Sequence, residues 1–593
     1  MTSVFFRVLM TLAIIVFVAS CGPSTPDKPA GAPITVYVAK TIITMEPDQP
    51  KAQWVAVADG KIVALGDGSP PKMLDNRHTQ IEKRFADKVL MPGFIDPHLH
   101  PMIAAVLLPT HFITPEDWNL PRGFEAGVKT RQAYLEKLKK ELAAAPPDQP
   151  FITWGWHALW HGPMSRADLD ALDNTKPVFI WQRSFHEIVT NTKGMEYLGV
   201  GQKADFEALI DHPGIDPAHA DFERGYFSET ALAAAFRRLA PAVMAPKWLG
   251  RGLGEMNALL LQNGVTTVSD MATGIFGSFP MEAGLIQKTY ARSDIPLRVM
   301  LMPYASEVTA RAGSLAAAPA LIKKDEAGFE GNRVFINNRV KLLADGAFFV
   351  PAMKLHSPAY LDGRPGKWIT KPDLLRQQAQ TFWDAGFNLH IHVNGDGGLD
   401  VVLDTLARLP RDGVHADQRI ILEHLGISRQ DQIARIADLG LMVSAQPNYL
   451  YVLGGKYADK LLEKDQAEHM VRLGSLERAG VPLALHSDMT MAPADPLFLA
   501  WIGVNRVNMD GQLMAPEERL SVDAAMRAIT IEAARMIGLE DRIGSLARGK
   551  TADFTVLDEN PYAVEPMRLR DIHVDGVVFE GKWYDAKKGA SDN

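Results

Sequence analysis

Short apolar runs alternate with helical patterns through the middle of the chain. Apolar runs of this length, bounded by turn residues, are typical of buried strands. Eight of them lie at residues 89–96, 264–270, 297–303, 339–345, 387–393, 419–425, 441–447 and 482–488. Helical patterns that end at a glycine separate many of them, as at residues 372–386. The alternation predicts an α/β protein with a (β/α)8 TIM-like barrel over residues 89–544.

The two ends of the chain carry a different pattern. Residues 34–66 contain two short strand-like runs, and residues 552–585 have the same character. We therefore expect a small β-sandwich domain assembled from both termini, residues 34–88 and 545–593.

The alternating pattern is interrupted between the first and second barrel strands. Residues about 105–245 include a helical pattern at 130–145 and a strand-like run at 177–184. This segment predicts a cap inserted after the first barrel strand.

The first 33 residues have the pattern of a targeting segment. A short basic start is followed by an apolar stretch, and Val18-Ala19-Ser20-Cys21 contains the one cysteine of the chain. Residues 1–21 resemble a bacterial lipoprotein signal peptide, and residues 22–33 a Pro/Gly/Ser tether. We expect acylation of Cys21, a lipid bilayer as partner, and a cell-envelope location on the periplasmic or extracytoplasmic side. An ordinary signal peptide or anchor with an incidental cysteine is the alternative.

Composition narrows the class of protein. The 593 residues are 47% hydrophobic and 22% charged, which excludes collagen-like, disulfide-stapled and disordered chains. The formal net charge of −8 argues against nucleic acid, which would demand a basic face. The sequence has no second stretch of about 18 apolar residues, so it does not have the pattern of a multi-span membrane protein. Oligomeric state is not indicated.

Polar side chains with metal-binding chemistry stand at the ends of the predicted strands. His98 and His100 are two residues apart, so a strand places both on one face. Such a pair alone is more often a packing feature than a metal site. His392, His424 and Asp488 each end a further apolar strand, at the edge where barrel enzymes carry their chemistry. Together these residues predict a metal centre at one rim.

Lys341 lies within the predicted strand 339–345, on the face opposite Val340 and Leu342. Lysine is rarely buried without a partner, because removing the ammonium from water costs several kcal/mol. A neutral amine beside metal can react with carbon dioxide and give a carbamate that bridges two cations. The alternative is a lysine that reaches solvent or pairs with a carboxylate such as Asp345.

The order of these residues resembles the amidohydrolase superfamily with a binuclear metal centre. The detailed sequence of the motifs resembles the amidohydrolase 3 group, which includes N-substituted formamide deformylase-like enzymes. The matching stretches are MPGFIDPHLHP, VKLLADGA, HIHVNGDGG, LEHLGIS, VSAQPNY, HSDMTMAPADPL and GSLARGKTADFTVLD, with FITWGWHALWHGPMSRADLD and FHEIVTNTKGMEYLGV in the cap. The resemblance covers essentially everything after residue 33. Its motifs are specific for the fold and the metal centre but poor at naming substrates.

The resemblance implies a ligand set. The histidine pair of the first strand and Asp488 would hold a buried divalent metal ion. His392 and His424 would hold an outer one, with carbon dioxide bound as a carbamate on Lys341 between them. Zinc suits this mixed imidazole and carboxylate ligation, with iron, manganese and cobalt as alternatives. His390 and His486 lie two residues before proposed ligands and are expected behind the metal ligands or in packing.

The expected activity is hydrolysis of an amide-like C–N bond of the N-substituted amide or formamide type. Metal lowers the pKa of water from about 15.7 toward neutrality and supplies hydroxide, and Asp488 is the expected proton carrier. The substrate would be a small molecule of unidentified structure. A mononuclear deaminase-like enzyme, an ester or lactone hydrolase and a non-catalytic regulatory or binding lipoprotein are the alternatives.

Three further residues are expected near the substrate. His186 and Asn191 belong to the cap motif FHEIVTN, which in relatives faces the substrate, although cap packing is an equal alternative. Gln446 follows the seventh strand and could donate a hydrogen bond to a carbonyl oxygen, with loop hydrogen bonding as its alternative.

Overall fold

The computed structural model describes residues 33–587, apart from residues 75–76, 148, 213–214, 330, 332 and 358. The predicted signal peptide, Cys21 and the tether up to residue 32 lie outside the described residues. Among the helices of the described part, none is both long and apolar enough to cross a membrane.

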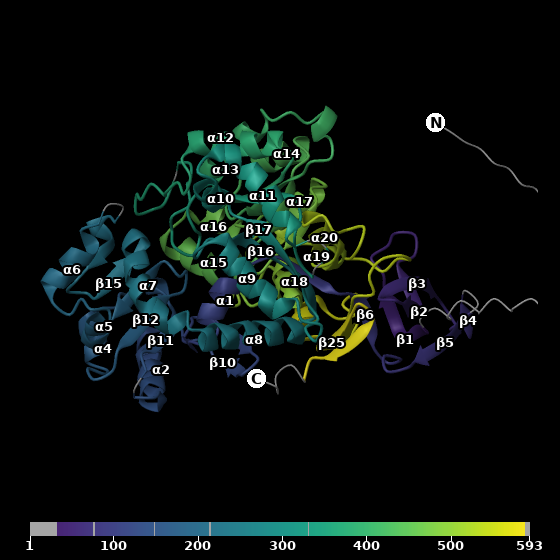
Figure 1. Cartoon of the computed structure of the whole chain (residues 1–593), viewed down its shortest axis with the longest axis horizontal. Helices are drawn as coiled ribbons and strands as arrows, with labels where there is room; N and C mark the ends of the chain where they lie inside the picture. Colours follow the sequence, from purple (N-terminus) through teal and green to yellow (C-terminus); the bar gives the residue numbers. More distant parts are fainter. Residues whose placement is uncertain are drawn as a thin grey trace, which may run out of the picture.

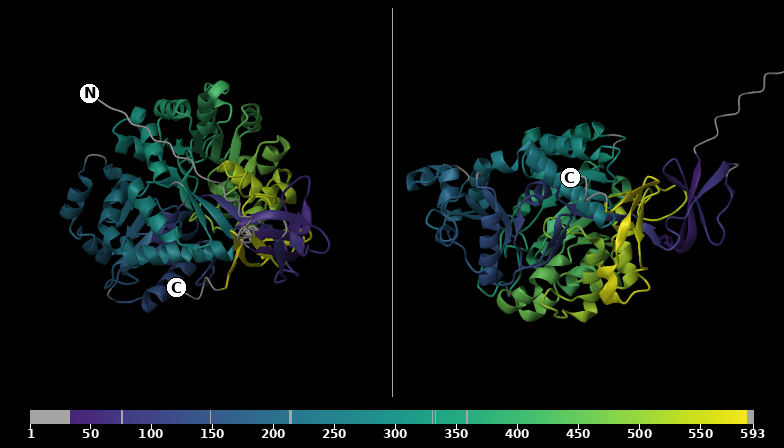
Figure 2. Two further views of the ribbon diagram at one scale, coloured as in Figure 1. Left: turned by 45° about the vertical axis from the view of Figure 1, so that its right-hand side comes forward. Right: turned by 90° about the horizontal axis from the view of Figure 1, so that it is seen from below.

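Strands from both ends of the chain form one nine-stranded sheet. β24 pairs antiparallel with β6, so that Phe554 lies opposite Pro92 and Val556 opposite Leu90. In Figures 1 and 2 the purple N-terminal strands and the yellow C-terminal strands lie side by side. The division of these strands into a separate sandwich domain stays a prediction. The strands are β1 (Ile34–Ile43), β2 (Lys51–Ala58), β3 (Lys61–Gly66), β4 (Met73–Leu74), β5 (Arg77–Glu82), β6 (Val89–Pro92), β24 (Phe554–Leu557), β25 (Val574–Phe579) and β26 (Lys582–Asp585).

The middle of the chain forms two parallel sheets that contain seven of the eight predicted strand runs and the end of the first one; residues 89–92 of that first run form β6 of the nine-stranded sheet instead. The first parallel sheet has the order β18-β17-β16-β7 and the second the order β19-β20-β21-β22-β23. Most of their residues are buried, as expected for parallel strands that helices cover on the outside. The strands are β7 (Phe94–Leu99), β16 (Val265–Thr273), β17 (Arg298–Pro303), β18 (Val334–Ile336), β19 (Arg339–Leu343), β20 (Asn388–Val393), β21 (Ile420–His424), β22 (Met442–Ala445) and β23 (Leu483–Leu485).

The two parallel sheets meet through isolated parallel bridges. One joins Tyr304 and Lys341, and the other joins Leu99 and Met489. Closure into a single eight-stranded ring stays a prediction, because the hydrogen-bonded ladders form two sheets. The helices that follow the strands are α9 (Phe279–Tyr290), α10 (Ala305–Ala312), α11 (Ala318–Ala327), α12 (Pro372–Asp384), α13 (Asp396–Leu406), α14 (Gln430–Asp438), α15 (Asn448–Lys460), α16 (Lys464–Glu468), α17 (Leu473–Arg478), α18 (Pro496–Asn505), α19 (Val522–Ala528) and α20 (Ile531–Met536).

A large insertion separates β7 from β16, although these two strands are neighbours in one sheet. It carries a six-stranded sheet of its own, in the order β14-β15-β13-β12-β11-β8. We call residues 105–245 the cap; its blue elements lie on the side of the molecule opposite the terminal strands (Figure 1). The strands of the six-stranded sheet are β8 (His111–Phe112), β11 (Phe151–Trp156), β12 (Val178–Gln182), β13 (Glu187–Thr190), β14 (Ala220–Asp221) and β15 (Tyr226–Ser228), and the cap has a second, two-stranded sheet of β9 (Trp118–Leu120) and β10 (Gly123–Glu125).

The helices of the insertion pack around this sheet and connect it to the parallel strands. A compact cluster that includes Tyr134, Leu138, Phe151 and Val178 forms a core within the cap. The cap therefore has its own interior and presents side chains to the ends of the parallel strands. The helices are α1 (Pro101–Leu107), α2 (Arg131–Ala144), α3 (Ala158–His161), α4 (Arg166–Asp170), α5 (Thr192–Tyr197), α6 (Lys203–Ile210), α7 (Glu229–Val243) and α8 (Pro246–Gln262), which leads into β16.

Candidate metal centre

The histidine pair of β7 meets Asp488 at the ends of the parallel strands. Asp488 Oδ1 lies 3.0 Å from His100 Nε2 and 3.5 Å from His98 Nε2. One ligand atom from each of the three residues lies within 4.8 Å of the others. Residues nearly 400 positions apart in the sequence are thus close enough to hold one metal ion.

A second group of possible ligands shares His98. The ligand atoms of His98, His424 and His486 also lie within 4.8 Å of one another. The ring centroid of His424 lies 4.6 Å from that of His98 and 4.6 Å from that of His392. His486, expected behind the ligands or in packing, thus lies as near to this group as the predicted ligand His424.

Burial favours the neutral form of the clustered histidines. It lowers the pKa of His392 to about 3 and that of His486 to about 4. The pKa values of His98 and His424 fall well below the usual range, first through burial and then through nearby charged groups. A neutral imidazole is the form that binds a metal ion, so this donor set fits a divalent cation.

Lys341 lies among these side chains without a hydrogen-bond partner. Its side chain is buried, and within the described part of the chain Nζ makes no hydrogen bond. Burial lowers the pKa of its ammonium to about 8. Asp345, the alternative partner, instead accepts hydrogen bonds from the backbone N–H groups of Lys354, Asn394 and Gly395. An orphaned buried amine is what a carbamate-forming lysine would present before it reacts.

Hydrogen bonds from neighbouring side chains determine which ring nitrogens are free. His424 Nδ1 lies 3.0 Å from Gln446 Oε1, which leaves Nε2 available for metal. His392 Nε2 lies 3.1 Å from Asn394 Nδ2, an amide NH2 group that can only donate, so Nε2 accepts this hydrogen bond and Nδ1 carries the proton of the neutral ring. Partners of this kind orient a ligand histidine and fix its tautomer.

Glu423 is a site residue that the sequence interpretation missed. Its carboxylate is fully buried and lies 2.8 Å from His98 Nδ1 and 2.6 Å from His390 Nδ1. Burial opposes ionisation, but Lys341 and the hydrogen bond from His390 together hold the pKa of Glu423 below its usual value. The available signal was a single acidic residue in the apolar strand RIILEHL, since glutamate is almost never fully buried unless paired.

Two predicted ligands have an uncommon backbone conformation. The φ angles of His424 and Asp488 are 76° and 52°, in the left-handed region that few non-glycine residues adopt. At His424 the backbone thereby leaves the strand geometry, in which consecutive residues alternate between faces. Conformations of this kind persist only where the surrounding contacts over-determine them, and they cluster at functional sites.

Asp96 connects the strand of the histidine pair to the strand end of Asp488. Its Oδ1 accepts hydrogen bonds of 3.3 Å from the backbone N–H groups of His98 and Ser487, and its Oδ2 accepts a short one from Ser487 Oγ. The Asp96 carboxyl group therefore holds the strand of the histidine pair and the residue before Asp488 together through hydrogen bonds.

The predicted substrate residues have different surroundings. Asn191 is buried in the cap, where its side chain accepts from the N–H groups of Val178 and Gly194 and donates to two backbone carbonyls. His186 is partly exposed and lies 3.3 Å from Glu229. Gln446 Nε2 is buried and has no hydrogen-bond partner in the described structure. Substrate contact stays a prediction for each of the three residues. For Asn191 the four hydrogen bonds to the backbone disfavour it.

Comparison with known proteins identifies the family. The model of the amidohydrolase family matches residues 86–584. The chain belongs to the amidohydrolase family. This membership confirms the predicted superfamily, and with it a hydrolase class whose members depend on metal.

Two relatives that match this amidohydrolase over most of their length differ in the function that their names describe. An N-substituted formamide deformylase from Arthrobacter pascens is 25% identical over 550 residues, which cover 89% of this chain and 94% of that protein. The Arabidopsis thaliana protein LONG AFTER FAR-RED 3 is 24% identical over 549 residues, 90% of this chain and 89% of that protein.

A solved structure shares the fold of this amidohydrolase. An uncharacterized metal-dependent hydrolase from Pyrococcus horikoshii OT3 superimposes with a TM-score of 0.65 and 22% sequence identity. The match covers 90% of this chain and 99% of that one. The likeness therefore extends over the cap as well as the parallel sheets.

Proposed function

We propose that this amidohydrolase hydrolyses a C–N bond in an amide-like small molecule, of the N-substituted amide or formamide type. The observation that carries the proposal is the convergence of the β7 histidine pair with Asp488, beside His424 and the orphaned Lys341 amine. The resemblance to a formamide deformylase over nearly the whole chain supports the choice of bond.

We propose that the centre binds two divalent metal ions, zinc being the ion that best suits the ligands. His98, His100 and Asp488 would hold one ion. His392 and His424 would hold the other, with a carbamate of Lys341 shared between the two. The free Nε2 of His424 supports this arrangement. When bound, such ions polarise a carbonyl group and lower the pKa of water.

The side chains of the protein would handle protons and position the substrate. The Asp488 carboxylate would take a proton and deliver it to the leaving nitrogen. Gln446 holds His424 through its carbonyl oxygen, and its Nε2, which has no partner among the described residues, would donate to a substrate oxygen.

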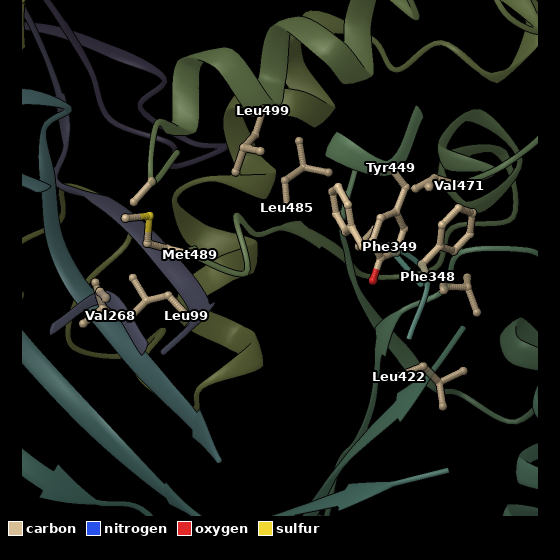
Figure 3. Packing of buried hydrophobic residues seen from close by; sticks show 14 of the residues in the cluster. Leu99, Val268, Phe348, Phe349, Leu422, Tyr449, Val471, Leu485, Met489 and Leu499 are labelled. Carbon is tan, nitrogen blue, oxygen red and sulfur yellow. The ribbon is translucent and has the colours of Figure 1, made fainter. Parts of the chain in front are cut away.

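Aromatic side chains border this part of the site. Figure 3 shows Phe348, Phe349 and Tyr449 together, and the rings of Phe348 and Tyr449 stack with centroids 4.2 Å apart. The ring of Tyr449 lies 6.3 Å from that of His424. These rings limit the access of water beside the histidines, which strengthens electrostatic interactions within the site.

The experiment is a substrate panel with the metal-loaded protein. N-substituted formamides, acylated amines, esters and lactones would be compared with and without chelator. We expect chelator-sensitive release of amine from amide-like substrates. Cleavage of esters or lactones alone, or deamination with one metal per chain, would overturn the proposed bond type, and metal-loaded protein without activity would favour a binding role.

We also propose that the mature protein is anchored to the cell envelope by acyl chains on Cys21. The support is the lipoprotein-like pattern of residues 1–21. Mass spectrometry of the membrane-extracted protein should find an acylated Cys21 at the N-terminus. A Cys21→Ser variant should lose this modification, and retention of the variant in the membrane would contradict the proposal.

A further inference from the structure

One side chain of the cap reaches the turn that follows Asp488. Arg183 lies directly after β12 and is fully buried. Its Nη1 donates to the carbonyl oxygen of Thr490 at 3.3 Å, and its Nη2 donates to that of Met491 at 2.7 Å. Arg183 therefore spans 308 positions of sequence to bind the two residues that stand two and three places after Asp488.

The guanidinium is held in one place by charge and by aromatic rings. Arg183 Nε donates to Glu116 Oε1 at 2.7 Å, and Glu116 is also buried. The rings of Trp154, Phe349 and Trp118 lie 4.4, 4.7 and 5.5 Å from the guanidinium carbon. A planar arginine can stack and donate in several fixed directions at once, which the point charge of lysine cannot reproduce.

The turn that carries Asp488 depends on contacts from several elements. The backbone N–H of Asp488 donates to the carbonyl oxygen of His98 at 3.0 Å, and that of Met491 donates back to Asp488 at 2.6 Å. Asn448 Nδ2 donates to the same Met491 carbonyl that Arg183 binds, at 2.7 Å. Because Asp488 itself has a left-handed φ of 52°, the turn needs such contacts to keep its conformation.

The cap also reaches the segment that follows Lys341. His157 Nε2 lies 3.2 Å from the carbonyl oxygen of Phe349, whose ring packs on the Arg183 guanidinium. Arg183 thus lies between the turn that follows Asp488 and the loop that follows β19, the strand of Lys341. The cap holds both of them against the same buried cation.

We propose that Arg183 is a positioning residue that holds the Thr490–Met491 turn and thereby sets the orientation of the Asp488 carboxylate. The activity readout of this inference rests on the proposed function. Arg183 touches no reacting atom, and its contribution reaches the site through two backbone carbonyls. Displacement of a positioned group by about 1 Å typically costs about 100-fold in rate.

The test compares variants of Arg183 with a matched arginine elsewhere. Arg183→Lys keeps the positive charge but loses the planar guanidinium with its several fixed N–H donors. A double variant, Glu116→Gln with Arg183→Met, removes both buried charges, so that neither is left unpaired. Arg298→Lys is the control, because Arg298 is also buried, pairs with Asp553 at 2.9 Å and packs on the ring of Phe579. It lies at the start of β17, at the end of the strand away from the metal centre.

The positioning role predicts a specific pattern across these variants. In the double variant kcat should fall about 10- to 100-fold while KM changes less than about 3-fold. Arg183→Lys should recover part of kcat, and Arg298→Lys should keep the kcat of the wild type. We express kcat per metal-loaded chain, because Asp488 is also a predicted metal ligand and its reorientation lowers metal affinity as well; Arg298→Lys should keep the wild-type metal content.

Amide hydrogen exchange gives a readout that does not depend on turnover. Exchange in the peptide that contains Met489–Met491 should become faster in both Arg183 variants, while the cap core around Tyr134 and Phe151 stays protected. Faster exchange over the whole cap would instead assign Arg183 to cap stability, and unchanged exchange with unchanged kcat would also overturn the proposal. If the wild type hydrolyses no C–N bond, the proposed function fails, and the exchange result still tests Arg183.

Discussion

Replacement of Glu423 by glutamine tests how the buried carboxylate supports the candidate metal centre. Glu423 accepts hydrogen bonds from two imidazoles, His98 at 2.8 Å and His390 at 2.6 Å. Glutamine has nearly the same shape but only one accepting oxygen. Its NH2 group would face the N–H of one of the two rings, so one histidine must lose its partner or turn.

The expected effect follows from these two contacts. A hydrogen bond to a charged acceptor contributes about 1.5–3 kcal/mol, and an unsatisfied buried donor costs about 1–3 kcal/mol. We therefore expect Glu423→Gln to lower the free energy of unfolding by about 3 kcal/mol. Loss of the group that orients a ligand histidine typically weakens metal binding about 10- to 100-fold.

The assay is metal competition against a chelator of known affinity, together with thermal unfolding. Glu518→Gln is a matched control, because Glu518 is also buried and accepts hydrogen bonds from Ser475 N and Oγ, both at 2.7 Å. The control should lose stability and keep its metal affinity. Metal affinity of Glu423→Gln within about 2-fold of the wild type would refute the reasoning.

Three further outcomes test the site. Asp488→Asn should abolish turnover and leave the fold intact; retention of more than a few per cent of kcat would remove Asp488 from proton transfer. Lys341→Ala should lose metal and activity together, with partial rescue by short carboxylic acids, whereas full metal occupancy in that variant would defeat the carbamate. Removal of metal by a chelator should lower the melting temperature, since a ligand at 100 times its Kd stabilises a protein by about 2.7 kcal/mol. An unchanged melting temperature would argue against a structural contribution from the ions.

Much of the site follows from the order of residues along the strands. His98, His392 and His424 end apolar runs, and parallel strands bring such ends to one edge. Asp488 could be added because it ends the last run in the same way. The position at the end of an apolar run is therefore enough to select these residues, even though His424 and Asp488 depart from strand geometry.

Residues that act through backbone distortion or across the fold are harder to predict. Strand alternation places Glu423 and His424 on opposite faces, and the left-handed φ of His424 removes that alternation. Arg183 follows a strand of the cap and meets the Asp488 turn only after the insertion folds over the parallel sheets. Neither contact has a periodic signal in the sequence.

The cap motif FHEIVTN shows that a match to a family motif does not by itself assign a role to a residue. The motif of Asn191 matches the family and leaves substrate contact and cap packing as equal alternatives, and in the structure the amide has backbone partners at Val178, Asp173 and Gly194. A motif can be shared because it builds a helix start, since asparagine is among the preferred residues at that position. Side-chain chemistry alone does not distinguish this role from substrate contact.

Anomalous scattering from crystals of the zinc-loaded protein tests the central claim most directly. We predict one zinc ion bound by the β7 histidine pair and Asp488, a second bound by His392 and His424, and extra density on Lys341 that bridges them. Zinc bound outside this cluster, or no zinc at these side chains, would contradict the claim that the ends of the parallel strands form a metal centre.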